Sequence, residues 1–346
     1  MSDPTAALPY ALGGPLGKGS IKRVPEDFVV EEVLGFVPSG EGEHVFLRIE
    51  KRHENTDYLA RQLAKFAKVP VRNVSYAGLK DRHGRTIQWF SVQLPGQAGP
   101  DWSGFESDTV RVLEVSRNAR KLRKGTARGN CFELTVRELS ALPEHLESRL
   151  AEIAAHGVPN YFGPQRFGHD GQNLERARDL FADDSRKLDP HKRGLYLSAA
   201  RSELFNQLLA ERVQDRTWNS AIPGDVFMFP DSRSFFTPEA VTDELLQRVA
   251  AREIHPSGVV WGVKPSTAAG TALDMEHRVA ERLAEMARGL KAAGLETSRR
   301  ALRLCPEAMT WDFPQPATLT LCFTLPTGAY ATAVLRELVH TERFDA

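Results

Sequence analysis

The sequence is poor in the residues that build disulfide frameworks and metal centres. Its 346 residues include three cysteines, Cys131, Cys305 and Cys322, and no two of them stand at the spacing of a zinc or redox motif. Scattered cysteines of this kind indicate neither a disulfide-stapled fold nor a zinc site, and they suit a reducing compartment. We therefore expect a cytoplasmic protein without a metal.

The chain also lacks long hydrophobic runs and nucleotide-binding loops. No stretch approaches the roughly 18 apolar residues of a membrane span, and the N-terminal MSDPTAALPYALGG has no basic segment followed by an apolar one. Neither a membrane contact nor a targeting segment is predicted. The motif GxxxxGK[ST] is absent, as is GxGxxG after a strand, so we expect no cofactor.

An excess of charge of either sign is missing too. Lysine and arginine number 45 and so do aspartate and glutamate, so any basic surface that binds nucleic acid has to be local. Hydrophobic residues make up 41% of the chain and charged residues 26%, which is typical of folded soluble proteins. The length favours two domains, or one domain with a large insertion.

The pattern of elements predicts an α+β fold in two parts. Strands are expected at 21–35, where Pro25 interrupts the run, and at 44–52, 71–79, 86–94, 110–116, 131–137, 301–313 and 317–326. Helical spacing is seen at 55–69, 142–155, 195–213, 274–293 and 327–341. The predicted elements become mostly helical at about residue 156 and mostly strand-like again near residue 304. We expect a discontinuous sheet domain, 1–155 with 305–346, interrupted by an insertion at 156–304.

One carboxylate stands among cations in the hexamer KDRHGR. Asp81 lies beside Lys80 and Arg82, with His83 and Arg85 close by. Cationic neighbours lower the pKa of a carboxyl, so Asp81 would be ionised and suited to act as a nucleophile or a base. A solvated turn containing Gly84 explains the same pattern, and both interpretations stay open. A metal site is discounted, because two ligands without a third are too few.

A second candidate is a basic linker, RNARKLRKGTARGN, at residues 117–130. It carries no acid and six basic residues, Arg117, Arg120, Lys121, Arg123, Lys124 and Arg128. Such a cluster is suited to phosphate contacts, although a solvated loop is the alternative. The linker leads into Asn130 and Phe132, which could bind a base edge and stack on a base.

Aromatic residues mark three further places. NYFGPQRFG contains Tyr161, Phe162, Arg166 and Phe167, a mixture that suits RNA contacts or packing between domains. Phe28 in PEDF is a stacking candidate or a core residue, and Lys22 upstream of it could pair with Asp81. Tyr330, in the first turn of the last predicted helix, either packs internally or faces a pocket.

Six separated blocks between about residues 18 and 341 carry a family pattern. They read PEDFVVEE, YAGLKDRHGRTIQWFSV, RKLRKGTARGNCFEL, VPNYFGPQRFG, LSAARSELFNQ and LPTGAYATAVLRELV. Together they closely resemble the TruD family of transfer-RNA pseudouridine synthases. The resemblance implies a pseudouridine synthase catalytic domain with a mixed, mainly antiparallel sheet, interrupted by a helix-rich α+β insertion domain.

The resemblance also implies roles for particular residues. The family's catalytic aspartate falls on Asp81, and its substrate-binding residues fall on Phe28, Asn130, Phe132 and Tyr330. Lys22 corresponds to the lysine that precedes PEDF and would pair with the aspartate. The family often has phenylalanine where this chain has Tyr330; stacking survives that change, but the added hydroxyl needs a partner. RNA backbone contacts are expected from Arg117, Arg120, Lys121, Arg123, Lys124 and Arg166.

The implied reaction is the isomerisation of uridine at position 13 of tRNA to pseudouridine. The N1–C1′ bond breaks, the uracil turns over and C5 bonds to C1′, on a base that has left its stack. This chemistry needs neither redox cofactor nor metal. The expected partner is tRNA, no protein partner is implied, and a monomer is expected. The alternative is a non-catalytic RNA-binding or RNA-chaperone module whose working surface is the basic linker.

Overall fold

The computed structural model describes residues 3–183, 188–230 and 232–343, which form two compact units. The sheet unit comprises Leu16–Leu150, Pro306–Gly328 and Val339–Ala346, and the helix-rich unit comprises Met1–Pro15, Ala151–Cys305 and Ala329–Leu338. The main breaks, after residues 150 and 305, lie close to the expected 155 and 304. Residues 3–15 and 329–338 belong to the helix-rich unit, although the sequence analysis assigns them to the catalytic domain. The functional division stays a prediction.

The sheet unit is built on one large sheet. Its strands are β1 (Lys18–Ile21), β2 (Phe28–Leu34), β3 (His44–Arg52), β4 (Val74–Tyr76), β5 (Arg85–Gln93), β6 (Val110–Asn118), β7 (Ala127–Val136), β14 (Glu307–Gln315), β15 (Thr318–Pro326) and β16 (His340–Arg343). Eight form the sheet, in the order β14-β15-β7-β2-β5-β3-β6 with β4 beside β5, while β1 and β16 pair separately in parallel. Of the pairs described in the large sheet, β2–β5 is parallel and the others are antiparallel, which confirms a mixed, mainly antiparallel sheet.

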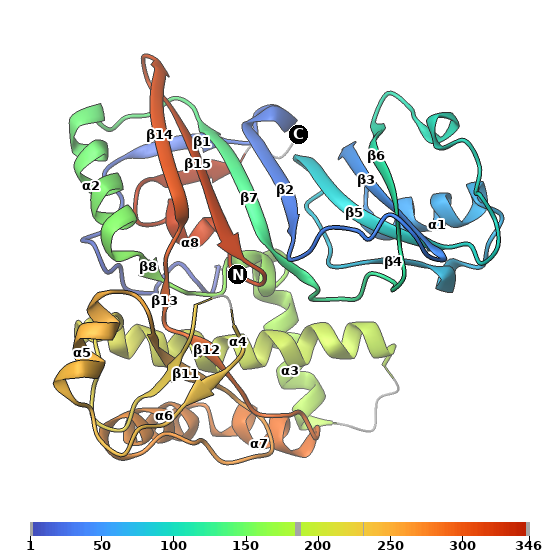
Figure 1. Ribbon diagram of the computed structural model, residues 1–346. Coiled ribbons are helices and arrows are strands. Elements are labelled where there is room, and N and C mark those ends of the chain that lie inside the picture. The colour runs from blue at the N-terminus through green and yellow to red at the C-terminus, as the bar shows by residue number, and fades with distance from the viewer. Residues whose placement is uncertain (1–2, 184–187, 231, 344–346) are drawn as a thin grey trace. The chain divides into compact units, whose positions relative to one another are not determined.

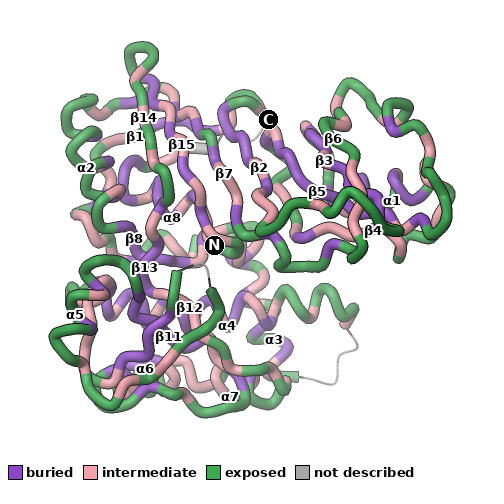
Figure 2. Tube along the Cα trace, viewed as in Figure 1, coloured by how far each residue is buried: buried purple, intermediate pink, exposed green. Residues whose placement is uncertain are grey.

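The alternation of β3 explains how this sheet acquires its core. Val45, Leu47 and Ile49 point to one face, where they pack against α1 (Thr56–Phe66) through residues that include Leu59 and Leu63. Asn55 caps α1, since its side chain accepts a hydrogen bond from the backbone N–H of Asp57. Figures 1 and 2 show α1 against β3 and β5, which are buried along most of their length, whereas the residues of β6 are mostly exposed or half-buried.

The helix-rich unit surrounds the long helix α4 (Pro190–Gln214). Its other helices are α3 (Gln172–Ala182), α5 (Asp243–Ala250), α6 (Gly270–Arg282), α7 (Ala284–Ala292) and α8 (Ala331–Leu335). Its strands β10 (Phe235–Phe236), β9 (Val226–Met228), β11 (His255–Val260) and β12 (Ser298–Ala301) form a sheet in that order, and β13 (Arg303–Leu304) pairs with β8 (Val158–Pro159). Apolar residues of α3, α4, α6 and α7 share one core, and Figure 1 shows these helices together in one part of the molecule. The α+β class is confirmed.

The remaining elements are one helix at the sequence boundary between the two units and several short turns of 3-10 helix. The helix α2 (Pro143–His156) spans residue 150, where the first sheet segment ends. Single turns of 3-10 helix occur at Pro25–Asp27, Val71–Asn73, Trp102–Phe105, Pro164–Arg166 and His169–Gly171.

Two predicted helices were wrong in extent. The helix expected at 274–293 is broken at Leu283, whose φ of −114° and ψ of 40° are not helical, so that α6 and α7 replace it. The closing helix expected at 327–341 shrinks to α8, and His340–Arg343 instead form β16 against β1. Strand pairing with a segment more than 300 residues away overrides the local helical preference, which is a weak determinant of structure.

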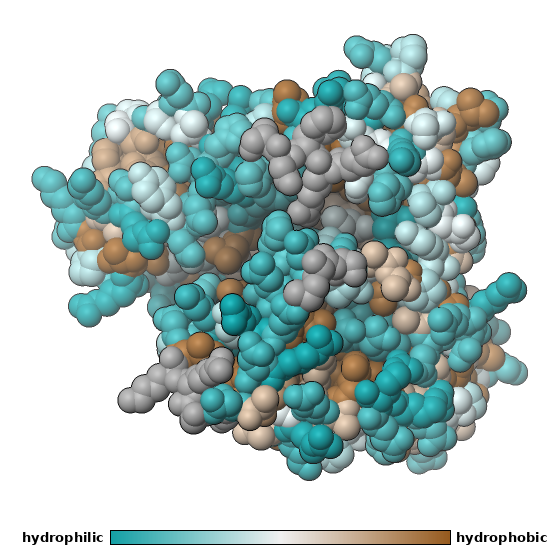
Figure 3. All heavy atoms as spheres, turned by 180° about the vertical axis from the view of Figure 1, so that it is seen from behind, coloured by the Kyte–Doolittle hydropathy of each residue, from teal (hydrophilic) through white to brown (hydrophobic). Residues whose placement is uncertain are grey.

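The surface carries apolar residues singly or in small groups. On the face shown in Figure 3, hydrophobic side chains form small patches separated by hydrophilic ones. Val37 and Leu79 are among the exposed large hydrophobic residues. Within residues 3–183, 188–230 and 232–343, no helix is long and apolar enough to span a membrane.

Candidate active site

The carboxylate of Asp81 lies on the connection between β4 and β5, residues 77–84, which we name the Asp81 loop. Gly84 ends the loop where it passes β2, and a Cβ atom there would lie 2.5 Å from the backbone oxygen of Phe28. Glycine is therefore needed for close approach of two backbones. The sequence predicted Gly84 as a turn residue, and the structure gives it this additional steric reason.

Besides the Lys22 pair described below and a backbone hydrogen bond from Gly125 N–H to the Ala77 oxygen at 2.9 Å, five hydrogen bonds that involve side chains attach the Asp81 loop to the rest of the sheet unit. Lys80 contributes two of them, its backbone N–H to Thr56 Oγ1 at 3.2 Å and its Nζ to Glu32 Oε2 at 2.6 Å. The other three are from Gln88 Nε2 to the Gly78 oxygen at 3.2 Å, from Lys51 Nζ to the Asp81 oxygen at 3.2 Å and from Arg82 Nε to the His53 oxygen at 3.1 Å. The backbone of the loop is thus fixed from several sides, which suits a functional group that needs fixed geometry.

Asp81 itself pairs with Lys22. Lys22 Nζ donates to Asp81 Oδ2, and the backbone N–H of His83 donates to Asp81 Oδ1 at 2.9 Å. Burial alone would raise the pKa of the Asp81 carboxyl, but the charge and hydrogen bond of Lys22 and the His83 N–H outweigh it and the pKa is lowered. About a third of the Asp81 side chain, 34%, stays exposed. The carboxylate is therefore ionised and accessible.

Lys22 also contacts an aromatic ring. Its Nζ lies 4.1 Å from the centroid of Phe28, which packs edge-on against Phe132 at 6.3 Å between centroids. The backbone of Lys22 has φ +60°, a conformation that residues with a Cβ rarely adopt and that is found at functional sites. Both phenylalanines are only 7% exposed. Both are therefore mostly packing residues, and their rings contact each other.

Asn130 lies on β7, the strand that also carries Phe132. It stands opposite Glu32 in the register of β2 and β7, two residues before Phe132. Its Oδ1 atom is buried and accepts no hydrogen bond within the described residues. A buried acceptor without a partner is costly, so this oxygen is a candidate for a donor that arrives with a ligand.

The basic linker divides into two groups. The side chains of Arg120, Lys121, Arg123 and Lys124 are exposed, and no hydrogen bond or ion pair is found for them in the described parts of the chain. Arg117 differs, because its guanidinium donates to the backbone oxygens of Gly42, Gln97 and Ala98 at 2.6 to 3.0 Å. Arg128 forms an ion pair with Glu307. Arg117 is thus engaged in the fold, which weakens the prediction that it contacts phosphate.

Tyr330 and Arg166 belong to the helix-rich unit, where they lie together. The Arg166 guanidinium is 5.4 Å from the centroid of Phe162 and 5.8 Å from that of Tyr330, and it donates to Ser198 Oγ at 2.9 Å. Arg300, which the sequence did not single out, lies 4.1 Å over the Phe162 ring. Tyr161 and Phe167 are buried, in keeping with packing roles.

Sequence reasoning missed two charged residues that hold the Asp81 loop, Glu32 and Lys51. Both are buried, at 2% and 0% exposure. A signal was present, because each occupies an inward position of an alternating strand where an apolar residue is expected. No group of histidine, cysteine, aspartate and glutamate suited to a metal ion is found in the part of the chain that the structure describes.

Comparison with known proteins places this architecture in one family. The family model described as tRNA pseudouridine synthase D (TruD) matches residues 7–175 and 172–338. A curated tRNA pseudouridine synthase D of Methylococcus capsulatus is 50% identical over 332 residues, 96% of this chain and 94% of that protein. Those of Pseudomonas putida W619 and Nitrosococcus oceani are 48% and 46% identical, over 96% and 97% of this chain and 94% of each protein.

A solved structure has the same fold. A crystal structure from Methanosarcina mazei, described as TruD, superposes with a TM-score of 0.68 at 23% identity, covering 96% of this chain and 95% of that one. The family match runs through both compact units and through every block of sequence that suggested the resemblance. The chain therefore belongs to the TruD family of tRNA pseudouridine synthases.

Proposed function

We propose that this protein isomerises uridine at position 13 of tRNA to pseudouridine, with Asp81 as the catalytic carboxylate. The proposal includes a monomeric, cytoplasmic enzyme with tRNA as its partner. The observation that carries it is the ionised, partly exposed carboxylate of Asp81 on an anchored loop, in a chain of the TruD family.

The charge state of Asp81 suits the reaction. Breaking the N1–C1′ bond and forming the C5–C1′ bond requires an anionic group beside the sugar and base, as nucleophile or as base. Lys22 lowers the pKa of Asp81 and keeps it anionic at neutral pH. The C5 proton leaves to solvent and N1 takes up a proton, so the reaction is balanced without any further reactant.

The surrounding groups suit a base that has left its stack. Phe28 and Phe132, whose rings contact each other, are assigned to the base, and Asn130 Oδ1, which has no hydrogen-bond partner among the described residues, would accept a hydrogen bond from the uracil N3–H. The exposed cations of the basic linker, with Arg166, are assigned to the RNA backbone, where each phosphate contact strengthens binding in a salt-dependent manner. Tyr330 is assigned to substrate binding from the helix-rich unit.

The test is the variant Asp81→Asn, which keeps the shape of the side chain and removes its charge. We expect it to abolish tritium release from tRNA that carries 5-tritiated uridine, while the dissociation constant for tRNA changes less than about threefold. Asp101→Asn is the matched control, since Asp101 is an exposed helix cap that asparagine can replace. Release at the wild-type rate by Asp81→Asn would refute the catalytic assignment.

The same tritium-release assay tests whether uridine 13 is the modified position and whether the protein is instead a non-catalytic RNA-binding module. A tRNA with cytidine in place of uridine 13 should release no tritium above background. If the wild-type protein binds tRNA with micromolar affinity or better and forms no pseudouridine in any tRNA, the non-catalytic RNA-binding module takes the place of the enzyme.

A further inference from the structure

The side chain of Lys51 is an ammonium group buried beside the Asp81 loop. It is fully covered, at 0% exposure, at the end of β3 on the face that packs toward α1. Its Nζ donates to two backbone oxygens, that of Glu54 at 2.8 Å and that of Asp81 at 3.2 Å. One buried amine therefore joins the turn before α1 to the residue that carries the candidate catalytic carboxylate.

The surroundings of Lys51 are only weakly anionic. The charged groups acting on it are the carboxylates of Asp81 and Glu54, which attract it, and the ammonium of Lys80, which repels it. Its cross-strand neighbour on β5, Thr86, is uncharged. Burial dominates and lowers the pKa of Lys51 to about 8, well below the ordinary value of a lysine.

A lysine at this fully buried position lowers the stability of the fold. Desolvating an ammonium opposes folding, and a methionine of similar length would fill the same volume without that cost. Lysine offers what methionine lacks, two directed N–H donors aimed at backbone oxygens and a positive charge within reach of Asp81.

We propose that Lys51 is a positioning residue, which in its protonated form fixes the backbone of Asp81 and thereby the direction of its carboxylate. This inference rests on the proposed catalytic role of Asp81. Lys51 acts through the carbonyl of Asp81 and contacts no substrate. Loss of its proton leaves weaker hydrogen bonds and no charge, so the Asp81 loop relaxes and catalysis slows.

The experiment measures single-turnover rates of pseudouridine formation from pH 6 to 9.5 for the full-length wild type, Lys51→Met and Lys51→Gln. Wild type should lose rate as the pH rises through about 8, because protonated Lys51 is present below that pH and lost above it. Lys51→Met should be about 10- to 100-fold slower at pH 7, with tRNA affinity within about threefold and no inflection near pH 8. Lys51→Gln, which can still donate to one oxygen, should lie between them and also lack the inflection.

Stability measurements separate positioning from a structural role. The pKa of Lys51 is lower in the folded state than in the unfolded state, so below about pH 8 the buried charge reduces the stability of the fold. This cost decreases as the pH rises from about 8 toward the ordinary pKa of lysine, and the protein gains stability over that range. The melting temperature of Lys51→Met should therefore not fall below that of wild type at pH 7. Lys65→Met, at an exposed position of α1, is the control for loss of a lysine.

Two outcomes overturn the proposal. The first is a wild-type rate for Lys51→Met at pH 7. The second is an alkaline inflection near pH 8 that persists unchanged in both Lys51 variants. These outcomes are distinct from failure of the proposed function, which is marked by activity in Asp81→Asn. If Asp81→Asn is inactive and Lys51→Met is fully active, only the positioning role is refuted.

Discussion

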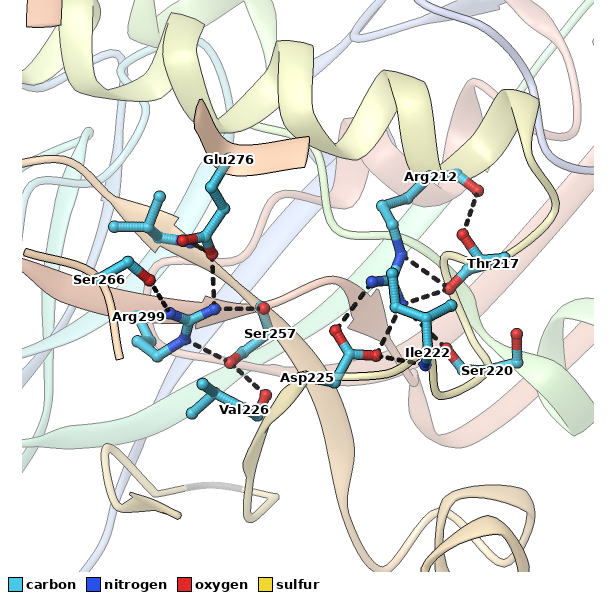
Figure 4. A network of polar contacts seen from close by, with 11 residues as sticks. Arg212, Thr217, Ser220, Ile222, Asp225, Val226, Ser257, Ser266, Glu276 and Arg299 are labelled. Carbon is cyan, nitrogen blue, oxygen red and sulfur yellow. Dashed lines mark hydrogen bonds and ion pairs between the residues drawn. The ribbon is translucent and has the colours of Figure 1, made fainter. Parts of the chain in front are cut away.

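One ion pair from each unit illustrates two opposite uses of charged side chains. In the helix-rich unit, Arg212 and Asp225 are 3% and 1% exposed and pair at 2.8 Å. Arg212 also donates to the backbone oxygens of Thr217 and Ser220, and Asp225 accepts the N–H of Ile222 (Figure 4). In the sheet unit, the Asp81 carboxylate has two donors and keeps 34% of its surface.

A second network in Figure 4 follows the first pattern. Arg299 pairs with Glu276 at 2.8 Å and donates to Ser257 and Ser266, with both charged side chains at most 4% exposed. Charges enclosed by backbone partners connect elements of a fold, since their alternative is an unpaired buried ion. A charge with one open side can receive a substrate. The degree of enclosure therefore distinguishes structural pairs from the candidate catalytic pair.

Breaking the enclosed pair should give the largest effect. Arg212→Met leaves Asp225 buried without its cation, which should lower the free energy of unfolding by about 3–5 kcal/mol. The rate per folded molecule should be unchanged, because neither residue belongs to the proposed site. Urea unfolding combined with activity at a temperature where the variant is folded provides the measurement.

An exposed pair in the same unit supplies the control. Arg176 and Asp179 on α3 are 3.5 Å apart and 62% and 52% exposed, so Arg176→Met should change stability by no more than about 0.5 kcal/mol. If both arginine variants lost the same stability, enclosure would not be the property that matters.

Lys22→Met tests the partly exposed pair of Lys22 and Asp81, and it should have a moderate effect on the rate of pseudouridine formation. Without Lys22 the largest influence that offsets the burial of Asp81 is lost, so the pKa of Asp81 rises. The rate should fall about 10- to 100-fold at pH 6, and less at pH 8, where the carboxylate is again ionised. In the wild type, with its lowered pKa, Asp81 stabilises the fold above its ordinary pKa, and this contribution is lost as the pH falls through the folded pKa.

The neighbouring Arg23→Met is the control for Lys22→Met. Arg23 forms an ion pair with Glu138 and is 41% exposed. Its removal should leave the pH profile in place. A profile for Lys22→Met parallel to that of wild type would mean that Lys22 does not set the charge of Asp81.

The sequence pointed to those residues of the candidate site that lie in or near local motifs. Asp81, Lys22 and Phe28 were found because PEDF and KDRHGR are recognisable strings, and the structure brings all three together. Lys51 and Glu32 were missed, because their burial depends on which face of β3 and β2 is covered, a property of the assembled sheet. The strand β16 was missed for the same reason, since its partner β1 lies at the other end of the chain.

The basic linker adds a third kind of charge to the comparison of enclosed and partly exposed pairs, namely cations that are exposed to solvent. Their removal should have the smallest effect of all these changes. Replacing Arg120, Lys121, Arg123 and Lys124 by alanine should weaken tRNA binding by about tenfold at physiological salt and reduce the slope of log K against log salt by up to about 3. Four exposed cations elsewhere, Lys65, Arg72, Lys264 and Lys291, supply a control with the same change in net charge. Equal slopes in the two quadruple variants would show that binding depends on net charge alone. A slope reduced only in the linker variant would place the phosphates at residues 120–124, since counterions are released only where cations meet the RNA backbone.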